Sequence, residues 1–415
     1  MKKRSPWTWI PSLYFAEGLP YVAVMTVSVI MYKKLDISNT DIAFYTSWLY
    51  LPWVVKPLWS PFVDLIKTKR WWVYTMQLLI GGGMAGVAFT IPMDFFFQAT
   101  LAFFWLMAFS SATHDIAADG FYMLGLPEED QAFFIGIRNT FYRIAMLIGQ
   151  GLLVMLAGFL EKSTGGIPFS WSIVFFVLSG IFIGLALWHK FILPRPASDA
   201  QRNDVTPQTI LSEFGKTFAS FFQKKGIVAA LFFMLTYRLG ESQLVKLASP
   251  FLLDKRIDGG LELETAQVGF AYGTVGVISL LLGGILGGIA ISKKGLKYWI
   301  WPMAIAMALP NLAYLYLAYA LPDNIFVVNA CVGIEQFGYG FAFTAYTMYL
   351  MLFSDGEYKT SHYAICTGFM ALGMMLPGMI SGWIQEMIGY QYFFIWVMIC
   401  CIPIFLSIPF LKIKE

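Results

Sequence analysis

The side chains in this sequence with the most evident chemical use are four carboxyl groups inside long apolar stretches. They are Glu17, Asp115, Asp119 and Glu241. A carboxyl group in a low-dielectric surrounding takes up a proton near neutral pH unless a nearby cation keeps it ionised. Such a group can load a proton on one side of a barrier and release it on the other. We therefore predict that these four residues are proton-coupling groups.

Basic, aromatic and imidazole side chains share the same apolar stretches and could bind a small molecule. The candidate binding residues are Tyr14, Tyr21, His114, Arg138, Tyr142, Arg143, Arg238, Lys246 and Glu335. The arginines could bind a ligand carboxylate or pair with an acid, and the tyrosine rings could stack on a sugar ring. Structural alternatives stay open. Either aspartate could clamp two helices together by pairing with Arg138 or Arg143, and His114 could be a hydrogen-bonded core residue.

The elements that must position these residues are membrane helices. The chain has 415 residues, of which 58% are apolar and only 13% are charged, against about 25% charged in an ordinary soluble domain. One membrane crossing takes about 20 mostly apolar residues. This composition excludes a water-soluble fold. A formal charge of +3 without a contiguous basic face also excludes nucleic acid as the partner.

Apolar runs between charged, proline or glycine breaks predict an all-α polytopic protein with twelve transmembrane helices. The predicted helices lie near residues 7–32, 41–58, 71–92, 96–124, 132–160, 168–192, 226–253, 265–291, 296–320, 325–353, 360–386 and 391–411. We expect an amphipathic segment at 211–222 to lie along the membrane surface. The predicted domains are a six-helix half at 1–193, a cytoplasmic linker at 194–225 and a second six-helix half at 226–415.

The basic residues in the connections predict the orientation. Cytoplasmic loops collect Lys and Arg, and alternate connections, counted from the N-terminus, hold eighteen of the 28 Lys and Arg residues, while the opposite set holds five. This asymmetry places both termini and the linker in the cytoplasm.

The two halves contain an internal repeat at a constant offset of 224 residues. The segment Leu156–Glu161 matches Ile380–Gln385, Gly149 matches Gly373, and Glu17 falls on Glu241. Two parallel repeats related by a pseudo-twofold axis along the membrane normal are typical of major facilitator transporters, which bind their substrate between the halves. The repeat therefore predicts that fold.

The connection between the second and third predicted helices, Ser60–Arg70, resembles the acidic and basic loop motif of the same superfamily. Only Asp64 can serve as its acidic member, because Gly288 stands at the corresponding place in the second half. A carboxylate at a helix end can pair with a cation or a helix terminus in one conformation and release it in another. We predict that Asp64 is a conformational latch; plain enrichment of cytoplasmic charge is the alternative.

Nothing in the sequence predicts an enzyme, a metal site or a cofactor. The four cysteines lie in apolar runs without metal-ligand spacing. The sequence has no phosphate-binding loop for ATP, and His114 has no companion serine in a nucleophile elbow.

Several stretches together resemble the anhydromuropeptide permease (AmpG-type) and acetyl-coenzyme A transporter family of the major facilitator superfamily. The stretches are Tyr14–Tyr21, Lys56–Asp64, His114–Asp119, Tyr142–Met146 and Ser249–Lys255. The resemblance spans nearly the whole chain. It implies import of N-acetylglucosamine joined to anhydro-N-acetylmuramic acid across the bacterial inner membrane, with protons.

The same resemblance implies that Asp115, Asp119 and Arg143 occupy the family's polar positions on helices 4 and 5. The sequence departs from the family at Glu17 and His114, where the family has an amide. We therefore expect a more acidic and titratable cavity, and a relative specialised for another saccharide is an open alternative.

Residues and resemblance together predict a monomeric, proton-coupled transporter in the bacterial inner membrane. The expected substrate is a muropeptide-like amino sugar or disaccharide, with protons and membrane lipid as the other partners. The alternative is an exporter or importer of another small molecule within the same superfamily, such as a different saccharide, a drug or a metabolite.

Overall fold

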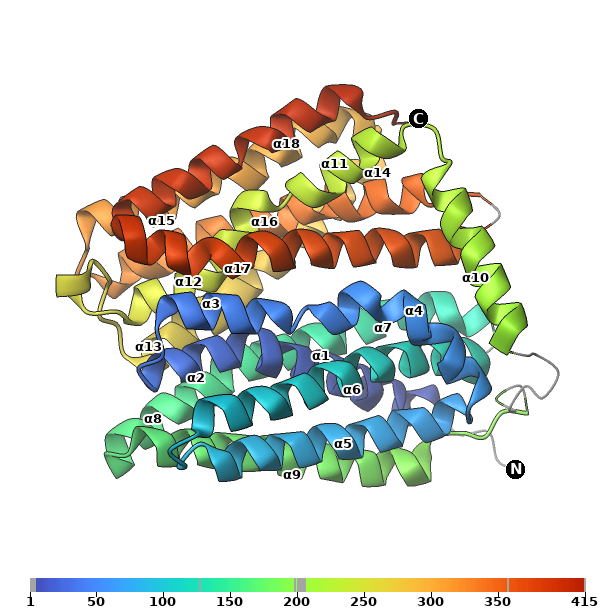
Figure 1. The fold of residues 1–415 in the computed structure, drawn as a ribbon, viewed down its shortest axis with the longest axis horizontal. Coiled ribbons are helices and arrows are strands. Elements are labelled where there is room, and N and C mark those ends of the chain that lie inside the picture. Colours follow the sequence, from blue (N-terminus) through green and yellow to red (C-terminus); the bar gives the residue numbers. More distant parts are fainter. Residues whose placement is uncertain (1–4, 127, 198, 200–206, 357, 414–415) are drawn as a thin grey trace. The chain divides into compact units, whose positions relative to one another are not determined.

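A computed structural model describes residues 5–126, 128–197, 199, 207–356 and 358–413 (Figure 1). Every regular element in these ranges is helical, which confirms the predicted all-α class. Within the helices, a few residues are described by their backbone alone; one of them is Asp64.

The chain divides into two compact units. The first comprises the described residues up to Met31 and those from Val55 to Leu211, and the second comprises Tyr32–Val54 and the residues from Ser212 onward. The predicted division into halves at 1–193 and 226–415 stays a prediction, because the two units describe only how the helices pack in this one conformation.

The first unit is built on a group of long helices. They are α1 (Ile10–Val22), α5 (Lys69–Thr90), α6 (Phe96–Gly125), α7 (Glu128–Leu147), α8 (Val154–Thr164) and α9 (Ile167–Ile192), with π-helical turns η2 (Ala23–Val27) and η3 (Ile148–Leu153) continuing α1 and α7. Helix α5 lies between α6 and α9, and α1 packs along α7. Helices α2 (Ser28–Lys34), α4 (Leu51–Leu65) and α10 (Pro207–Phe222) each cross a boundary between the units.

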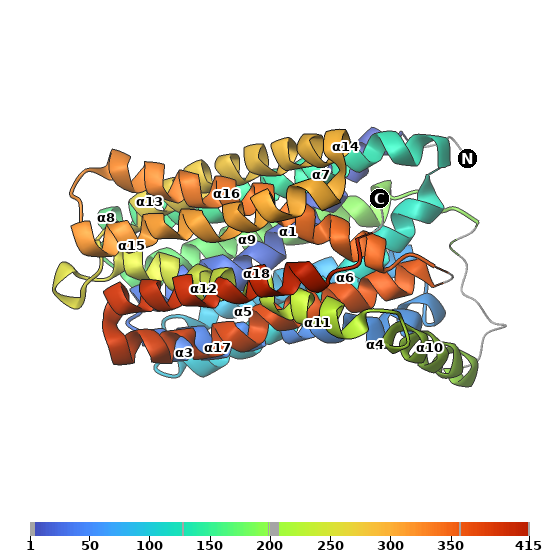
Figure 2. The same cartoon turned by 90° about the horizontal axis from the view of Figure 1, so that it is seen from above.

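The second unit contains the remaining long helices. They are α3 (Asn39–Trp48), α11 (Ile227–Thr236), α12 (Leu239–Leu253), α13 (Thr265–Val268), η5 (Gly269–Gly276), α14 (Val277–Ala308), α15 (Leu312–Ala320), α16 (Ile325–Phe353), α17 (Lys359–Cys400) and α18 (Ile402–Ser407). Helices α14 and α16 lie side by side (Figure 2). They approach so closely that a Cβ added at Gly283 would lie 2.1 Å from the Phe337 carbonyl oxygen.

The long apolar helices mark the chain as a multi-pass membrane protein. In the described residues, eight helical stretches are long and apolar enough to cross a membrane, or nine if one bent pair counts as a span. The longest two, Thr265–Ala320 and Ser361–Phe410, each contain a glycine with a positive φ, Gly295 and Gly389, where the helix is interrupted. The predicted count of twelve therefore remains a prediction.

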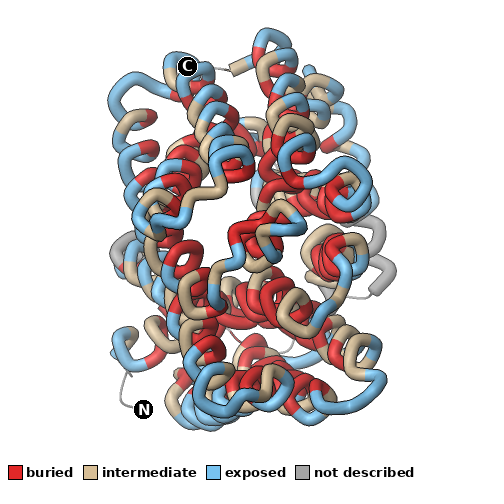
Figure 3. Tube along the Cα trace, turned by 90° about the vertical axis from the view of Figure 1, so that its left-hand side faces the viewer, coloured by how far each residue is buried: buried red, intermediate tan, exposed pale blue. Residues whose placement is uncertain are grey.

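Large apolar side chains on the helix surfaces agree with a lipid environment. Buried and exposed residues alternate along the helices (Figure 3). Phe159, Phe191 and Phe326 are each more than three-fifths exposed. Apolar surface of this kind is stable against lipid chains and would be costly in water.

Two predicted spans are interrupted by local backbone breaks. The predicted helix at 41–58 ends as α3 at Trp48 and resumes as α4 at Leu51, because Pro52 has no N–H to donate to the Trp48 carbonyl and its ring clashes with that carbonyl. The predicted helix at 226–253 breaks at Tyr237 and Arg238, so that α12 begins inside the span.

The internal repeat is visible in how each unit packs. In the first unit, a Cβ at Gly149 would lie 2.7 Å from Val22 of α1. In the second unit, a Cβ at Gly373 would lie 3.2 Å from the carbonyl oxygen of Leu235 in α11. Both glycines, 224 residues apart, thus allow the same kind of close helix contact within their own units.

The start of the predicted linker is attached to the first unit through Asp199. Its carboxylate accepts hydrogen bonds from the backbone N–H groups of Lys69, at 2.7 Å, and Arg70, at 3.1 Å. These N–H groups lie in the first turn of α5, where no carbonyl of the same helix precedes them. Asp199 therefore serves as an additional N-terminal cap for α5, supplied from a distant part of the chain.

Candidate functional site

Two ion pairs connect three helices in the first unit. Lys56 of α4 lies 3.1 Å from Asp115 of α6, measured from Nζ to Oδ2. Arg138 of α7 lies 2.9 Å from Asp119 of α6, measured from Nη2 to Oδ1. All four side chains are partly exposed, between 19% and 42%, so both pairs are in contact with accessible space.

Two tyrosine rings enclose the Arg138 guanidinium. Its central carbon lies 4.5 Å from the ring centre of Tyr14 and 5.3 Å from that of Tyr122. The Tyr14 hydroxyl also donates a hydrogen bond to Asp119 at 3.2 Å. Cation–π contacts and the shared acid hold Arg138 in one orientation. The structure therefore shows Asp119 and Arg138 as a pair that clamps α6 to α7, which the sequence left open as an alternative.

Glu17 lies on α1 close to these pairs and has an unsatisfied oxygen. Its Oε2 atom is buried and has no hydrogen-bond partner among the described residues. The next residue, Gly18, allows α7 to approach, since a Cβ there would lie 2.8 Å from the Tyr142 carbonyl oxygen. A buried carboxyl oxygen without a partner is costly unless it holds a proton or meets a ligand or water.

The other candidates on α7 and its neighbours have different surroundings. Tyr142 is half-buried beside Tyr21 and Arg143. Arg143 makes a contact of 3.7 Å with the sulfur of Met146 and has no carboxylate partner in the described part of the chain. Of the two arginines proposed as partners for the α6 aspartates, the structure thus pairs only Arg138.

His114 belongs to a buried chain of hydrogen bonds. Its Nε2 atom lies 2.9 Å from Gln77 Nε2, Gln77 Oε1 lies 2.8 Å from His189 Nδ1, and His189 Nε2 lies 2.9 Å from the Ser12 hydroxyl. His114, Gln77 and His189 are at most 1% exposed. The chain links α6, α5, α9 and α1, which matches the structural alternative for His114.

In the second unit, the break at Arg238 places Glu241 in the first turn of α12. The free N–H groups and the partial positive charge of a helix N-terminus favour a carboxylate at that place. Glu241 is 2% exposed and Glu335 of α16 is 1% exposed. The two acids lie within hydrogen-bonding reach of each other.

Arg238 lies against aromatic rings of α16. Its guanidinium carbon is 5.1 Å from the ring centres of both Tyr339 and Phe343, and it donates a hydrogen bond to the Tyr339 hydroxyl. This arrangement resembles that of Arg138 in the first unit, because each arginine is held by two aromatic rings beside an acid.

Lys246 is almost fully enclosed, with 2% exposure. Its Nζ atom donates to the Thr46 hydroxyl at 2.9 Å and lies 5.2 Å from the Tyr50 ring centre. No carboxylate lies within ion-pair distance of it among the described residues. Lys246 therefore binds α12 to the segment that contains α3, away from Glu241 on the same helix.

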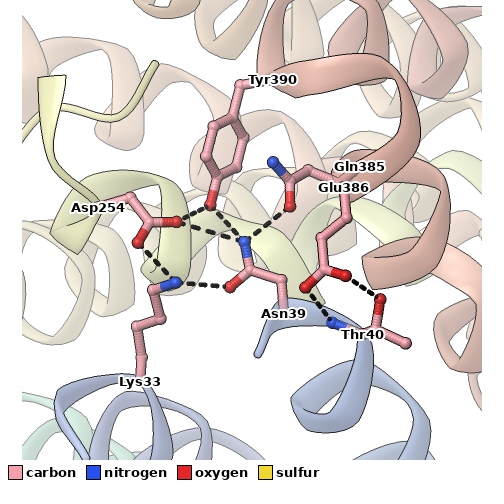
Figure 4. A network of polar contacts seen from close by, with 7 residues as sticks. All are labelled: Lys33, Asn39, Thr40, Asp254, Gln385, Glu386 and Tyr390. Carbon is pink, nitrogen blue, oxygen red and sulfur yellow. Dashed lines mark hydrogen bonds and ion pairs between the residues drawn. The ribbon is translucent and has the colours of Figure 1, made fainter. Parts of the chain in front are cut away.

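A larger polar network occupies one end of the second unit. It comprises Lys33, Asn39, Thr40, Asp254, Gln385, Glu386 and Tyr390 (Figure 4). Lys33 forms an ion pair with Asp254, and the Asn39 amide donates to Gln385 at 2.7 Å. The hydroxyl of Thr40 donates to Glu386 at 2.6 Å. The network fastens the start of α3 to α17 and to the end of α12.

The side chain of Asp64, the predicted latch, lies outside the described part of the structure. Among the described residues, no group of three His, Cys, Asp or Glu side chains is arranged to hold a metal ion.

Comparison with known proteins decides the family. The model of the Major Facilitator Superfamily matches residues 12–361. The chain belongs to this superfamily. It is also 24% identical over 400 residues to the anhydromuropeptide permease of Escherichia coli K12, covering 94% of this chain and 76% of the permease.

Solved structures of the superfamily share its fold. A D-xylose-proton symporter matches with a TM-score of 0.73 at 11% identity, over 98% of this chain and 97% of the symporter. The nucleoside transporter NupG, as a D323A mutant, matches with a TM-score of 0.71 at 15% identity, over 97% and 99% of the two chains. These matches confirm the fold.

Membership of the superfamily establishes the general activity. The protein is a multi-pass membrane transporter of a small-molecule substrate, and the expectation of a transporter rather than an enzyme is confirmed. The predicted resemblance to the anhydromuropeptide permeases is confirmed as well.

Sequence analysis missed three polar residues that complete these clusters. Lys56 was named only as part of the stretch Lys56–Asp64, although a lysine in an apolar segment is itself a signal of a buried partner. Gln77 and His189 were missed because their hydrogen bonds join helices more than 100 residues apart, and a neutral side chain in a helix gives no comparable signal.

Proposed function

We propose that the protein imports a muropeptide-like amino sugar or disaccharide together with protons across the bacterial inner membrane. The proposed substrate is N-acetylglucosamine joined to anhydro-N-acetylmuramic acid. The observation that carries the proposal is the cluster around Arg138, where two tyrosine rings hold the guanidinium against Asp119 and the ion pair itself is partly accessible. The similarity to an anhydromuropeptide permease over 94% of the chain supports the choice of substrate.

The chemistry of this cluster suits an anhydro-muramyl sugar. The lactyl carboxylate of a muramic acid is a partner for Arg138, whose fork of N–H donors matches a carboxylate. Asp119 can accept hydrogen bonds from sugar hydroxyls, and the half-buried Tyr142 offers a face for a ring, while Tyr14 holds Arg138 in place. When the sugar carboxylate engages Arg138, it competes with Asp119 for the guanidinium.

That competition gives a route for proton coupling. An aspartate that loses its cation in a low-dielectric site takes up a proton more readily. We infer that Glu17, Asp115, Asp119 and Glu241 are the groups among which the transported proton is held. Lys56 restrains Asp115 in the same way that Arg138 restrains Asp119.

Transport follows alternating access in this proposal. The halves at 1–193 and 226–415 rock about the substrate, the linker at 194–225 stays in the cytoplasm with both termini, and Asp64 acts as a latch. The protein works as a monomer. Arg143, Arg238, Lys246, Glu335, Tyr21 and His114 are the remaining candidates for contacts to the substrate.

The test is uptake of radiolabelled disaccharide into proteoliposomes that contain the purified protein. We expect sugar uptake above that of protein-free liposomes and stimulation by an inwardly directed proton gradient. Arg138→Gln should reduce uptake at least tenfold, whereas Arg256→Gln, at an exposed pair with Asp323, should leave it unchanged. Absence of sugar uptake by a folded protein that instead transports a nucleoside, drug or pentose would overturn the proposal.

A further inference from the structure

Three buried polar atoms in the second unit have no hydrogen-bond partner among the described residues. They are Oε2 of Glu241, Oε1 of Glu335 and the hydroxyl of Tyr314. The three residues are 2%, 1% and 0% exposed, and they come from α12, α16 and α15. Tyr314 interacts electrostatically with both acids. Buried polar atoms are nearly always hydrogen-bonded, so three unsatisfied atoms at one place indicate an occupant.

The contact between the two acids identifies this occupant. Glu241 and Glu335 lie within hydrogen-bonding reach of each other, but two ionised carboxylates contain only acceptors. Such a contact is stable when one proton lies between them. The other oxygen of Glu335 is already satisfied by the Gln336 amide, which donates to Oε2 at 2.9 Å.

The charges around the pair also favour a single proton. The titratable groups that interact with it are Arg238, Tyr272, Tyr314 and Cys401, and Tyr339 and Cys331 lie next to the two tyrosines. Only Arg238 among them is a cation at neutral pH. Two ionised acids against one guanidinium would leave a net negative charge in a buried site, and one bound proton removes it.

We propose that Glu241 and Glu335 form a shared one-proton site in the second unit and that this site carries the transported proton. This deepens the proposed function and rests on it for the coupling to sugar. With the proton bound, one acid donates to the other. When the proton leaves to water, the Tyr314 hydroxyl can donate to the vacated oxygen, and Arg238 balances the remaining charge. Glu335 is then a proton-binding residue rather than a contact to the sugar.

Infrared spectroscopy of the purified protein tests the site without any substrate. A protonated carboxyl group absorbs separately from an ionised one. We expect wild type at neutral pH to show a protonated-carboxyl band that is lost in Glu335→Gln, because the new amide can donate to Glu241 in place of the proton. Asp323→Asn, which removes a 95% exposed acid, is the matched control and should keep the band. An unchanged band in Glu335→Gln would overturn the proposal.

Tyr314→Phe provides a second variant that keeps the ring and removes only the hydroxyl. The ionised state then loses its replacement donor, so the pH midpoint of the band should rise by about one unit, a tenfold gain in proton affinity. A midpoint equal to that of wild type would contradict the assigned role of Tyr314 in the site.

Transport assays then connect the site to coupling. In proteoliposomes, Glu335→Gln should still exchange labelled for unlabelled disaccharide but should lose accumulation driven by a proton gradient. Gradient-driven accumulation equal to wild type would overturn the proposal. If wild type does not transport the disaccharide at all, the proposed function fails, while the infrared result still decides whether the pair holds a proton.

Discussion

Replacing Gly382 by alanine should break the closest contact in the second unit between α3 and α17. A Cβ at this position would lie 2.0 Å from the Asn39 carbonyl oxygen and 2.7 Å from the Thr40 backbone nitrogen. Both are backbone atoms, so α3 has to move away as a unit. The displacement would pull the Asn39 amide from its hydrogen bonds to Gln385 and Tyr390, at 2.7 and 2.9 Å.

The sign of the effect follows from two opposing contributions. Replacing glycine by alanine inside a helix normally stabilises it by about 1 kcal/mol. Overpacking a close contact costs about 1–3 kcal/mol, and each lost hydrogen bond of Asn39 costs about 1 kcal/mol more. We therefore expect Gly382→Ala to lower stability by about 2–4 kcal/mol.

Thermal unfolding of the purified protein measures this difference. Gly180→Ala is the matched control, because nothing lies within 4 Å of a Cβ added there on α9. The melting temperature of Gly382→Ala should fall by several degrees, and that of Gly180→Ala should stay unchanged or rise. A Gly382→Ala protein as stable as the control would refute the packing of α3 on α17.

Three further predictions concern the buried charges and the linker. Asp115→Asn should reduce sugar uptake into proteoliposomes at least tenfold, because it leaves the Lys56 ammonium without its ion-pair partner. Adding Lys56→Met should restore the melting temperature but not the uptake. Lys246→Met should leave the melting temperature unchanged or raise it. The buried ammonium has a hydroxyl and a ring as partners but no ion-pair partner among the described residues. A large loss of stability would contradict this prediction. Asp199→Ala should cost about 1 kcal/mol of capping and speed proteolysis of the linker, whereas Asp199→Asn, which can also cap, should resemble wild type.

The sequence predicted which charged residues are functionally notable more reliably than it predicted which residues contact each other. A charged side chain in an apolar stretch is costly wherever it lies, so Glu17, Asp119 and Glu241 could be recognised without a structure. The pairing of Asp119 with Arg138 was among the alternatives that the sequence left open, because both residues lie on helices that are consecutive in the chain.

Partners from distant helices could not be predicted. Lys246 meets Thr46, 200 residues away, and Glu241 meets Glu335, because helix rotation and tilt set these contacts and no local pattern encodes them. The interruption after Trp48 had a signal in the following proline, but continuous hydrophobicity concealed it. The break at Arg238 had no such signal.

The central claim, that sugar and protons move together, is tested most directly by measuring both fluxes in one preparation. Proteoliposomes containing a pH-sensitive dye are supplied with external disaccharide in the absence of any pH gradient. The account predicts that the interior acidifies as labelled sugar enters, and that both signals depend on sugar concentration in the same way. Sugar entry without acidification, in a preparation that responds normally to a proton ionophore, would contradict it.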